Sequence, residues 1–284
     1  MPSRYLDAAE LRRHAEHRYD FGSKSLAGRV VLVAGGIGGL GAAVTALLLQ
    51  EGALPVVGYR GQRGRALAFQ QKLQDRYGGL VTLVEGDLLE AETGRRYIDA
   101  ALTVKPELYG LVSLIGDPAR VKPAELDEPA LAASCRANFI APILLARAAA
   151  EEMARRATAG AIVLLASMQA VHAFEGSLAY AAPKAALVHA ARVLAKEYGG
   201  PRDVRVNVVA PGATTAGMAR ASIESGKYDP YVERGAIRRF GRPEDVARVV
   251  RLLLEPDSYI TGQVLTVDGG LTLRRDRITG SPER

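Results

Sequence analysis

Short apolar runs alternate with longer amphipathic stretches along most of this chain. The runs are rich in Val, Ile and Leu and lack polar alternation, which is typical of strands buried on both faces of a sheet. They predict strands at 29–34, 54–59, 80–85, 108–114, 161–167, 204–209 and 263–267. The stretches between them predict helices at 42–50, 63–77, 93–103, 129–157, 178–198 and 243–254. This alternation predicts an α/β fold, a doubly wound parallel sheet of about seven strands with helices on both faces.

No linker divides the alternating segment, and no repeat or low-complexity stretch interrupts it. We therefore expect one Rossmann-fold domain at 28–273. Residues 1–27 precede the first strand and form an N-terminal extension, with a charged helix predicted at 6–19. Residues 274–284 are predicted to be a polar C-terminal tail.

Five glycines within seven positions follow the first predicted strand, in the run Gly35-Gly36-Ile37-Gly38-Gly39-Leu40-Gly41. A helix is predicted to begin directly after them. Glycines let the backbone approach a pyrophosphate, and a helix amino-terminus offers N–H donors and the positive end of a dipole. The stretch 30–50 carries no charge and could also be taken for a membrane span, but its glycines weigh against that interpretation.

Composition narrows the function classes. The 284 residues are 48% hydrophobic, and a single cysteine, Cys135, excludes an internal disulfide and favours a reducing cytoplasm. The first 25 residues hold no apolar run of the kind found in signal peptides. The net charge is +6, but Lys and Arg are interleaved with acids and Trp is absent. We therefore expect neither a nucleic-acid surface nor a membrane partner.

Tyr180 and Lys184 lie four positions apart in a predicted helix, and Ser167 precedes the tyrosine by thirteen positions. Residues four apart share one helix face. An ammonium beside a phenol favours the phenolate, so we expect Lys184 to lower the pKa of Tyr180 from its usual value near 10. Such a pair can donate a proton to a carbonyl oxygen or take it back.

Taken together, the motifs resemble those of the short-chain dehydrogenase/reductase family, in its compact single-domain branch, and are similar to 3-oxoacyl-carrier-protein reductases. The glycine run fits Thr-Gly-x-x-x-Gly-x-Gly with Ala34 in place of threonine. The carboxy-terminal segments Gly241-Arg242-Pro243-Glu244-Asp245 and Val267-Asp268-Gly269-Gly270 also match the family pattern. The resemblance covers about residues 26–272.

The resemblance implies a catalytic set of Asn138, Ser167, Tyr180 and Lys184. Tyr180 would be the general acid, Ser167 a donor to the substrate carbonyl, and Asn138 the holder of a water that links Lys184 to solvent. Implied cofactor contacts are Gly35, Ile37, Gly38, Gly39, Leu40, Gly41, Arg60, Asp87, Leu88, Gly116, Tyr180, Lys184, Pro211, Gly212 and Thr214.

Three positions depart from the family pattern. Ser113-Leu114-Ile115-Gly116 replaces the usual Asn-Asn-Ala-Gly after the fourth strand, and only its glycine is kept. Ala34 lacks the hydroxyl that usually ties the glycine turn to this segment, so the two losses are predicted to be linked. Pro183 removes a helix N–H, which is harmless only in a first turn, so the helix is expected to begin close to Tyr180.

Cofactor choice can be predicted from the end of the second strand. An acidic residue about twenty positions after the glycine turn usually accepts the adenine ribose hydroxyls of NAD. Tyr59 occupies that place and Arg60 follows it. A guanidinium matches phosphate geometry, so we expect NADP(H) to be preferred, with Arg60 on its 2′-phosphate and NAD(H) as the alternative.

The sequence thus predicts an NADP-preferring oxidoreductase that transfers hydride between nicotinamide and a small carbonyl or alcohol substrate. The alternative is a non-catalytic dinucleotide sensor that retains the fold. A homotetramer or homodimer is expected, with the helices 141–157 and 178–198 at the interfaces, as in relatives. The segment 214–240 is expected to form a substrate lid that carries Arg220, Lys227, Arg234, Arg238 and Arg239. No metal site is expected, and metal binding by His14 and His17 of the predicted helix 6–19 is the disfavoured alternative.

Overall fold

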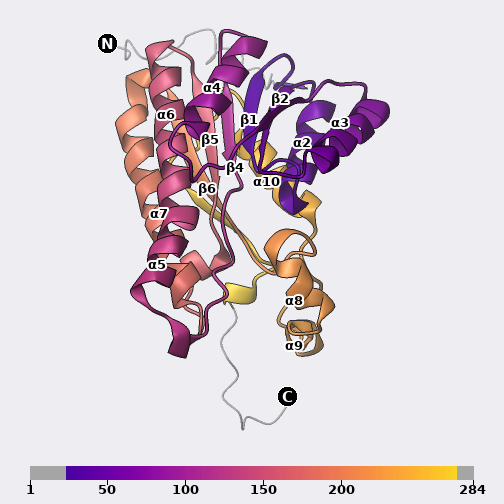
Figure 1. Cartoon of the computed structure of the whole chain (residues 1–284), viewed down its shortest axis with the longest axis vertical. Coiled ribbons are helices and arrows are strands. Elements are labelled where there is room, and N and C mark those ends of the chain that lie inside the picture. Colours follow the sequence, from indigo (N-terminus) through magenta and orange to yellow (C-terminus); the bar gives the residue numbers. More distant parts are fainter. Residues whose placement is uncertain (1–23, 274–284) are drawn as a thin grey trace, which may run out of the picture.

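Helices cover both faces of one parallel seven-stranded sheet in the computed structural model, which describes residues 24–273 (Figure 1). The strand order is β3-β2-β1-β4-β5-β6-β7. The strands are β1 (Val30–Ala34), β2 (Leu54–Tyr59), β3 (Thr82–Glu85), β4 (Gly110–Ser113), β5 (Gly160–Leu165), β6 (Val204–Pro211) and β7 (Val264–Val267). The helix predicted at 6–19, with His14 and His17, and the tail at 274–284 lie outside the described residues. The predicted fold class is confirmed.

The helices follow the strands as the sequence pattern predicts. They are α2 (Gly39–Gln50), α3 (Arg63–Tyr77), α4 (Thr93–Val104), α5 (Glu128–Cys135), α6 (Ala141–Arg155), α7 (Leu178–Tyr198), α8 (Arg220–Glu224), α9 (Asp229–Glu233) and α10 (Pro243–Leu253). Helices α4 to α7 lie on one side of the sheet, and α2, α3 and α10 lie on the other (Figure 1). The uncharged stretch 30–50 is a buried strand followed by a helix, so it is not a membrane-spanning helix.

The helix predicted at 129–157 is divided. Between α5 and α6, the segment Arg136–Ile140 forms a π-helical turn. Pro142 explains the break, because proline has no N–H and cannot bond to the carbonyl four residues earlier, that of Asn138. Such π turns are often found at functional sites.

Length and composition alone would allow Glu128–Arg155 to cross a membrane. One face of this stretch instead packs on the sheet through Leu145, Ala149 and Met153, all of which are buried in the core. The opposite face exposes Leu144, whose surface is 55% accessible, and Ile140. The stretch is therefore an amphipathic pair of helices packed on the sheet, and its outer face carries Leu144 beside the exposed ion pair of Arg147 and Glu151.

The strand order reverses between β1 and β4, whose neighbouring helices go to opposite faces of the sheet. In an open α/β sheet such a switch point leaves a crevice at the carboxyl ends of the strands, where ligands bind. Ala34 and Ser113 end β1 and β4 there and are paired in register. The predicted site residue Gly35 follows Ala34 directly, and Gly116 lies three residues after Ser113.

Candidate active site

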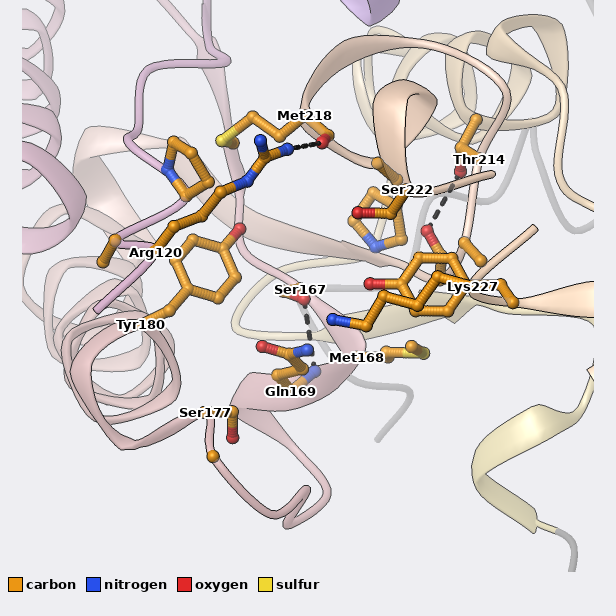
Figure 2. Close-up of a pocket in the computed structure, with 18 of the residues that line it drawn as sticks. Arg120, Ser167, Met168, Gln169, Ser177, Tyr180, Thr214, Met218, Ser222 and Lys227 are labelled. Atoms are coloured by element: carbon orange, nitrogen blue, oxygen red, sulfur yellow. Dashed lines mark hydrogen bonds between the residues drawn. The ribbon is translucent and has the colours of Figure 1, made fainter. Parts of the chain in front are cut away.

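Ser167 and Tyr180 lie together in a cleft at the carboxyl end of β5 (Figure 2). Ser167 follows the strand in extended conformation, and its hydroxyl caps the short turn Met168–Ala170 by accepting the Gln169 N–H at 3.2 Å. Tyr180 stands in the first turn of α7, which begins at Leu178, close to Tyr180 as expected, but Pro183 is the sixth residue of the helix and lies beyond its first turn. The loop and the helix start thus bring the two hydroxyls to one cleft.

Burial raises the pKa of Tyr180 to about 12. A side-chain hydrogen bond with Ser167 pulls the pKa down, and the negative charge of Asp117 pushes it further up. The expectation that Lys184 lowers this pKa below 10 is therefore wrong. Removal of the phenol from water raises this pKa, and the Lys184 Nζ lies 6.0 Å from the centroid of the Tyr180 ring.

Lys184 lies beneath the cleft floor and is only 1% exposed. Its Nζ donates to the backbone carbonyls of Leu165 at 2.9 Å and Ile115 at 3.2 Å. Burial lowers the pKa of this ammonium to about 7. The lysine therefore links the ends of β4 and β5 and titrates near neutrality.

Asn138 is fully buried in the π-helical turn. Its Nδ2 donates to the Asp117 carbonyl at 2.9 Å and to Ser134 Oγ at 3.0 Å, while its Oδ1 accepts the Asp117 N–H at 3.0 Å. Ser134 in turn donates to the Ala179 carbonyl. Asn138 thus positions the loop after β4, and its predicted water-holding role stays a prediction.

The surroundings of Gly116 show why residue 116 is still a glycine although the three residues before it differ from the family pattern. A Cβ there would lie 2.8 Å from Asn138 Oδ1 and 3.1 Å from Lys184 Nζ. Only a residue without a side chain lets the loop pass this close to both polar groups. Gly116 therefore belongs to the packing of the site floor.

Ser113, the first residue of the segment that differs from the family pattern, has an unsatisfied polar group. Its hydroxyl is buried and has no hydrogen-bond partner among the described residues. Its register partner is Ala34, which has no side chain able to bond it. This pairing supports the predicted link between the two departures. The threonine that the family has at position 34 would place its hydroxyl beside the Ser113 hydroxyl, which has no partner here.

A second cleft of about 610 Å³ opens at the glycine turn. It is lined by the predicted residues Gly35, Ile37, Gly38, Arg60, Asp87, Leu88 and Gly116. Helix α2 begins after Gly38 without any side-chain cap, and a Cβ at Gly38 would meet no atom closer than 3.9 Å. Backbone N–H groups at a helix start without a side-chain cap fit a dinucleotide pyrophosphate.

Of the other predicted cofactor residues, two glycines pack against backbone and four residues line the Ser167 cleft. Gly41 packs against the Gly35 carbonyl, and Gly39 against the backbone of Gly217, so closely that neither place has room for a Cβ. The residues Leu40, Pro211, Gly212 and Thr214 line the Ser167 cleft. The segment 119–121 lines both clefts, which makes them neighbours.

Arg60 and Asp87 form an ion pair at the outer end of the second cleft, with Nη1 and Oδ2 3.1 Å apart. The Arg60 side chain is 71% exposed. A backbone hydrogen bond from Leu89 and then the Arg60 guanidinium hold the pKa of Asp87 below its usual value, against a smaller opposing effect of burial. Tyr59 instead turns its hydroxyl to Glu85, at 3.3 Å.

The Ser167 cleft has a volume of about 560 Å³ and is roofed by the segment 214–240. Thr215 and Gly241 join the two ends of this segment through a backbone hydrogen bond of 2.9 Å. Of the five lid cations predicted, Lys227 lines the cleft, whereas Arg220 and Arg239 pair with Glu224 and Asp245. Arg234 and Arg238 are not among the lining residues.

Sequence reasoning missed Arg120 and Gln169, which line the same cleft (Figure 2). Arg120 extends from the loop after β4, and its Nη2 donates to the Met218 carbonyl of the lid at 3.1 Å. Its place four residues after Gly116 was the available signal. Across residues 24–273 no group of three or more His, Cys, Asp or Glu could hold a metal ion.

Known proteins are similar to this chain in both sequence and fold. A family model described as "Enoyl-(Acyl carrier protein) reductase" matches residues 35–272. The human dehydrogenase/reductase SDR family member 4 is 32% identical over 258 residues, covering 88% of this chain and 89% of that protein. The 3-oxoacyl-(acyl-carrier-protein) reductase of Aquifex aeolicus is 32% identical over 252 residues, covering 87% of this chain and 98% of that one.

Among solved structures, a short-chain type dehydrogenase/reductase from Mycobacterium ulcerans superimposes with a TM-score of 0.82 at 30% identity. It covers 88% of this chain and 92% of its own. Levodione reductase superimposes with a TM-score of 0.80 at 25% identity, covering 88% of this chain and all of its own. The chain belongs to the short-chain dehydrogenase/reductase family of oxidoreductases.

Proposed function

We propose that this protein catalyses NADP(H)-dependent interconversion of a small carbonyl compound and its alcohol. One observation carries the proposal. The Ser167 and Tyr180 hydroxyls lie in one cleft, directly beside a second cleft built on the uncapped start of α2. A substrate bound in the first cleft would therefore lie next to a dinucleotide bound in the second.

The nicotinamide, when bound, supplies or accepts the hydride. In the direction of reduction, the Tyr180 hydroxyl donates its proton to the substrate oxygen as that oxygen gains charge. Ser167 donates a hydrogen bond to the same oxygen and stabilises the developing charge. Oxidation runs these steps backwards, with Tyr180 taking the alcohol proton.

Lys184 supports the tyrosine from below. In the protein alone, its ammonium is held by the Leu165 and Ile115 carbonyls, and the pKa of Tyr180 stays high. We propose that Lys184 also meets the nicotinamide ribose and helps the phenol to ionise during turnover. Asn138 holds the loop that carries Gly116 and Asp117 against this lysine.

The preference for NADP(H) rests on the outer end of the second cleft. The position where NAD-binding proteins carry an acidic residue is Tyr59 here, and the exposed guanidinium of Arg60 lies next to it. Asp87 competes for that guanidinium, so a 2′-phosphate would share Arg60 with it or displace it. Fluorescence titration with NADPH and NADH tests the preference. Arg60→Ala should weaken NADPH binding about 10-fold or more and leave NADH binding unchanged.

Two other functions fit less well. A sensor that only binds the dinucleotide has no use for the Ser167 and Tyr180 hydroxyls in a separate cleft beside the dinucleotide. The matched family model is described as an enoyl reductase, but in this family enoyl reductases of the divergent branch have a longer spacing between tyrosine and lysine. The spacing of four residues here favours reduction of a C=O bond.

Turnover tests the proposal directly. Purified protein with NADPH is offered a panel of ketones and aldehydes, and with NADP⁺ a panel of alcohols, while absorbance at the nicotinamide band is followed. Turnover of at least one carbonyl compound that is lost in Tyr180→Phe supports the proposal. Binding of NADPH without turnover of any compound would favour the sensor instead.

We also propose a homotetramer or homodimer in the cytoplasm. Helices α6 and α7 expose Leu144, Leu178 and Val193 although each helix packs its other face on the sheet. Closed symmetric assembly would cover these exposed apolar side chains. Light scattering at micromolar concentration tests this: a monomer would overturn it, and Leu144→Glu should shift an oligomer toward smaller species.

A further inference from the structure

Cations outnumber carboxylates around the cleft that holds Ser167 and Tyr180. Arg120, Lys122 and Lys227 line it, against one acidic residue, Glu175. Asp117 lines the neighbouring dinucleotide cleft, where its carboxylate accepts the Ala119 N–H at 2.8 Å, although its charge still reaches Tyr180. The substrate cleft therefore presents an excess of positive charge.

Two of these three cations have no ion-pair partner among residues 24–273. Lys122 is neutralised by Glu125 at 3.2 Å. Arg120 contacts only a neutral group, the Met218 carbonyl, and the Lys227 ammonium lies 5.8 Å from the centroid of the Tyr228 ring. A guanidinium or ammonium left without a carboxylate keeps its capacity for charge-assisted hydrogen bonds to an anion.

The two unneutralised cations approach the reacting groups from different elements. Arg120 comes from the loop after β4 and lies above Tyr180, whereas Lys227 comes from the turn between α8 and α9 (Figure 2). The Lys227 side chain extends across the cleft with its ammonium toward Ser167 and Gln169 (Figure 2). A substrate held by Ser167 and Tyr180 would thus have Lys227 on one side and Arg120 on another.

The lid that carries Lys227 is anchored. Ile237, near its carboxyl end, is buried against Met168 and Leu271, which lie beside the Ser167 loop and after β7. The bridge between Thr214 and Gly241 joins the two ends of the lid to each other. An ammonium on an anchored lid loses less freedom when it binds an anion than one on an open loop.

We infer that the substrate carries an anionic group, a carboxylate or a phosphate, which Lys227 and Arg120 bind while its carbonyl lies on Ser167 and Tyr180. This inference rests on the proposed function and deepens it by assigning the substrate class. Lys227 is the principal contact, because it is aimed at the carbonyl position. Arg120 is the second contact and also ties the loop after β4 to the lid.

Matched substrate pairs test the inference. A series of 2-oxo and 3-oxo acids is compared with the methyl esters of the same acids, and a hydroxyketone phosphate is compared with its unphosphorylated form. We expect kcat/KM about 10-fold or more higher for the charged member of at least one pair. The pair that responds distinguishes a carboxylate from a phosphate.

Charge-removing variants assign the effect to residues. Lys227→Met should raise KM for the charged substrate about 10-fold and leave the neutral partner within twofold. Lys122→Met and Arg220→Met are matched controls, because each removes a cation that already pairs with a glutamate. Arg120→Met should act like Lys227→Met, and Arg120→Lys should recover most of the loss if charge rather than lid contact matters.

The outcomes separate this inference from the proposed function. Turnover of neutral members with equal or higher kcat/KM, unchanged in Lys227→Met, would overturn the anionic class and leave carbonyl reduction standing. If no compound turns over, calorimetric titration of each acid and its ester into protein saturated with NADPH decides the inference alone. Tighter binding of the acid that is lost in Lys227→Met supports it, and equal binding of acid and ester refutes it.

Discussion

The floor and the rim of the substrate cleft are built in opposite ways. On the floor, Asn138 and Lys184 are buried and bonded mainly to backbone carbonyls from the ends of neighbouring elements. On the rim, Arg120 and Lys227 are exposed and project from loops. The floor is therefore held by the sheet itself, whereas the rim depends on which side chains the loops happen to carry.

This difference teaches where chemistry and specificity reside. A proton donor must keep its geometry to within fractions of an ångström, so it belongs on buried, fully bonded elements. Substrate selection needs only complementary charge and shape, which exposed loop residues can supply. Substitutions in and near the floor, each compared with a matched residue, test this difference.

The largest effect is expected from the phenol of the floor. Tyr180→Phe should lower kcat about 10²-fold to 10⁴-fold, since the general acid is lost while the ring still fills its place. Tyr228→Phe, on the rim of the same cleft, should stay within threefold. Steady-state rates on any active substrate measure both. Activity of Tyr180→Phe within threefold of wild type would reject its role as the acid.

A methyl group in the floor should have the next largest effect. Gly116→Ala places a Cβ 2.8 Å from Asn138 Oδ1 and 3.1 Å from Lys184 Nζ. Displacement of these groups by about an ångström should cost roughly 10²-fold in kcat/KM. Gly64→Ala in α3, where a Cβ meets nothing within 4 Å, is the control and should leave activity intact. Equal activity of the two variants would contradict the packing argument.

The buried lysine should make stability depend on pH. Burial lowers the pKa of Lys184 to about 7 in the folded protein, from a usual value of about 10.5. Between these values the unfolded chain binds more protons, so the free energy of unfolding should rise with pH from 7, by at most about 1.4 kcal/mol per pH unit. Above pH 10 the raised pKa of Tyr180 acts in the opposite direction, because the unfolded phenol ionises first.

Urea unfolding of wild type, Lys184→Met and Lys227→Met at pH 7, 8 and 9, at one protein concentration, measures this slope. Lys184→Met should lose it, and Lys227→Met, whose ammonium is exposed, should keep it. A slope that survives in Lys184→Met would assign it to another group.

The smallest effect concerns two buried serines with opposite surroundings. Ser113 has an orphaned hydroxyl, so Ser113→Ala should raise the free energy of unfolding by up to about 1 kcal/mol without loss of activity. Ser134 bonds to both Asn138 and the Ala179 carbonyl, so Ser134→Ala should lower it by about 1–3 kcal/mol. Urea midpoints check both signs, and destabilisation by Ser113→Ala would show that its hydroxyl has a partner.

Much of the fold and the identity of the floor residues could be predicted from the sequence. The strand and helix alternation depends on local periodicity, and the predicted strands agree with the seven observed to within a few residues. Ser167, Tyr180 and Lys184 could be selected because their spacing and the strand-turn-helix context are local. The start of α7 close to Tyr180 was also predicted, although Pro183 lies inside the helix, where the Ala179 carbonyl that lacks its N–H accepts the Ser134 hydroxyl instead.

Only the tertiary structure decided what depends on distant contacts. The high pKa of Tyr180 follows from burial between elements, which the spacing to Lys184 does not report. The ion pair of Arg60 with Asp87 joins residues 27 positions apart. Arg120 and Lys227 are more than a hundred positions apart and share one cleft because the lid folds back over β5. Local patterns therefore determined the scaffold and the reacting groups, whereas the charge of the cleft required side chains from separate loops to meet in space.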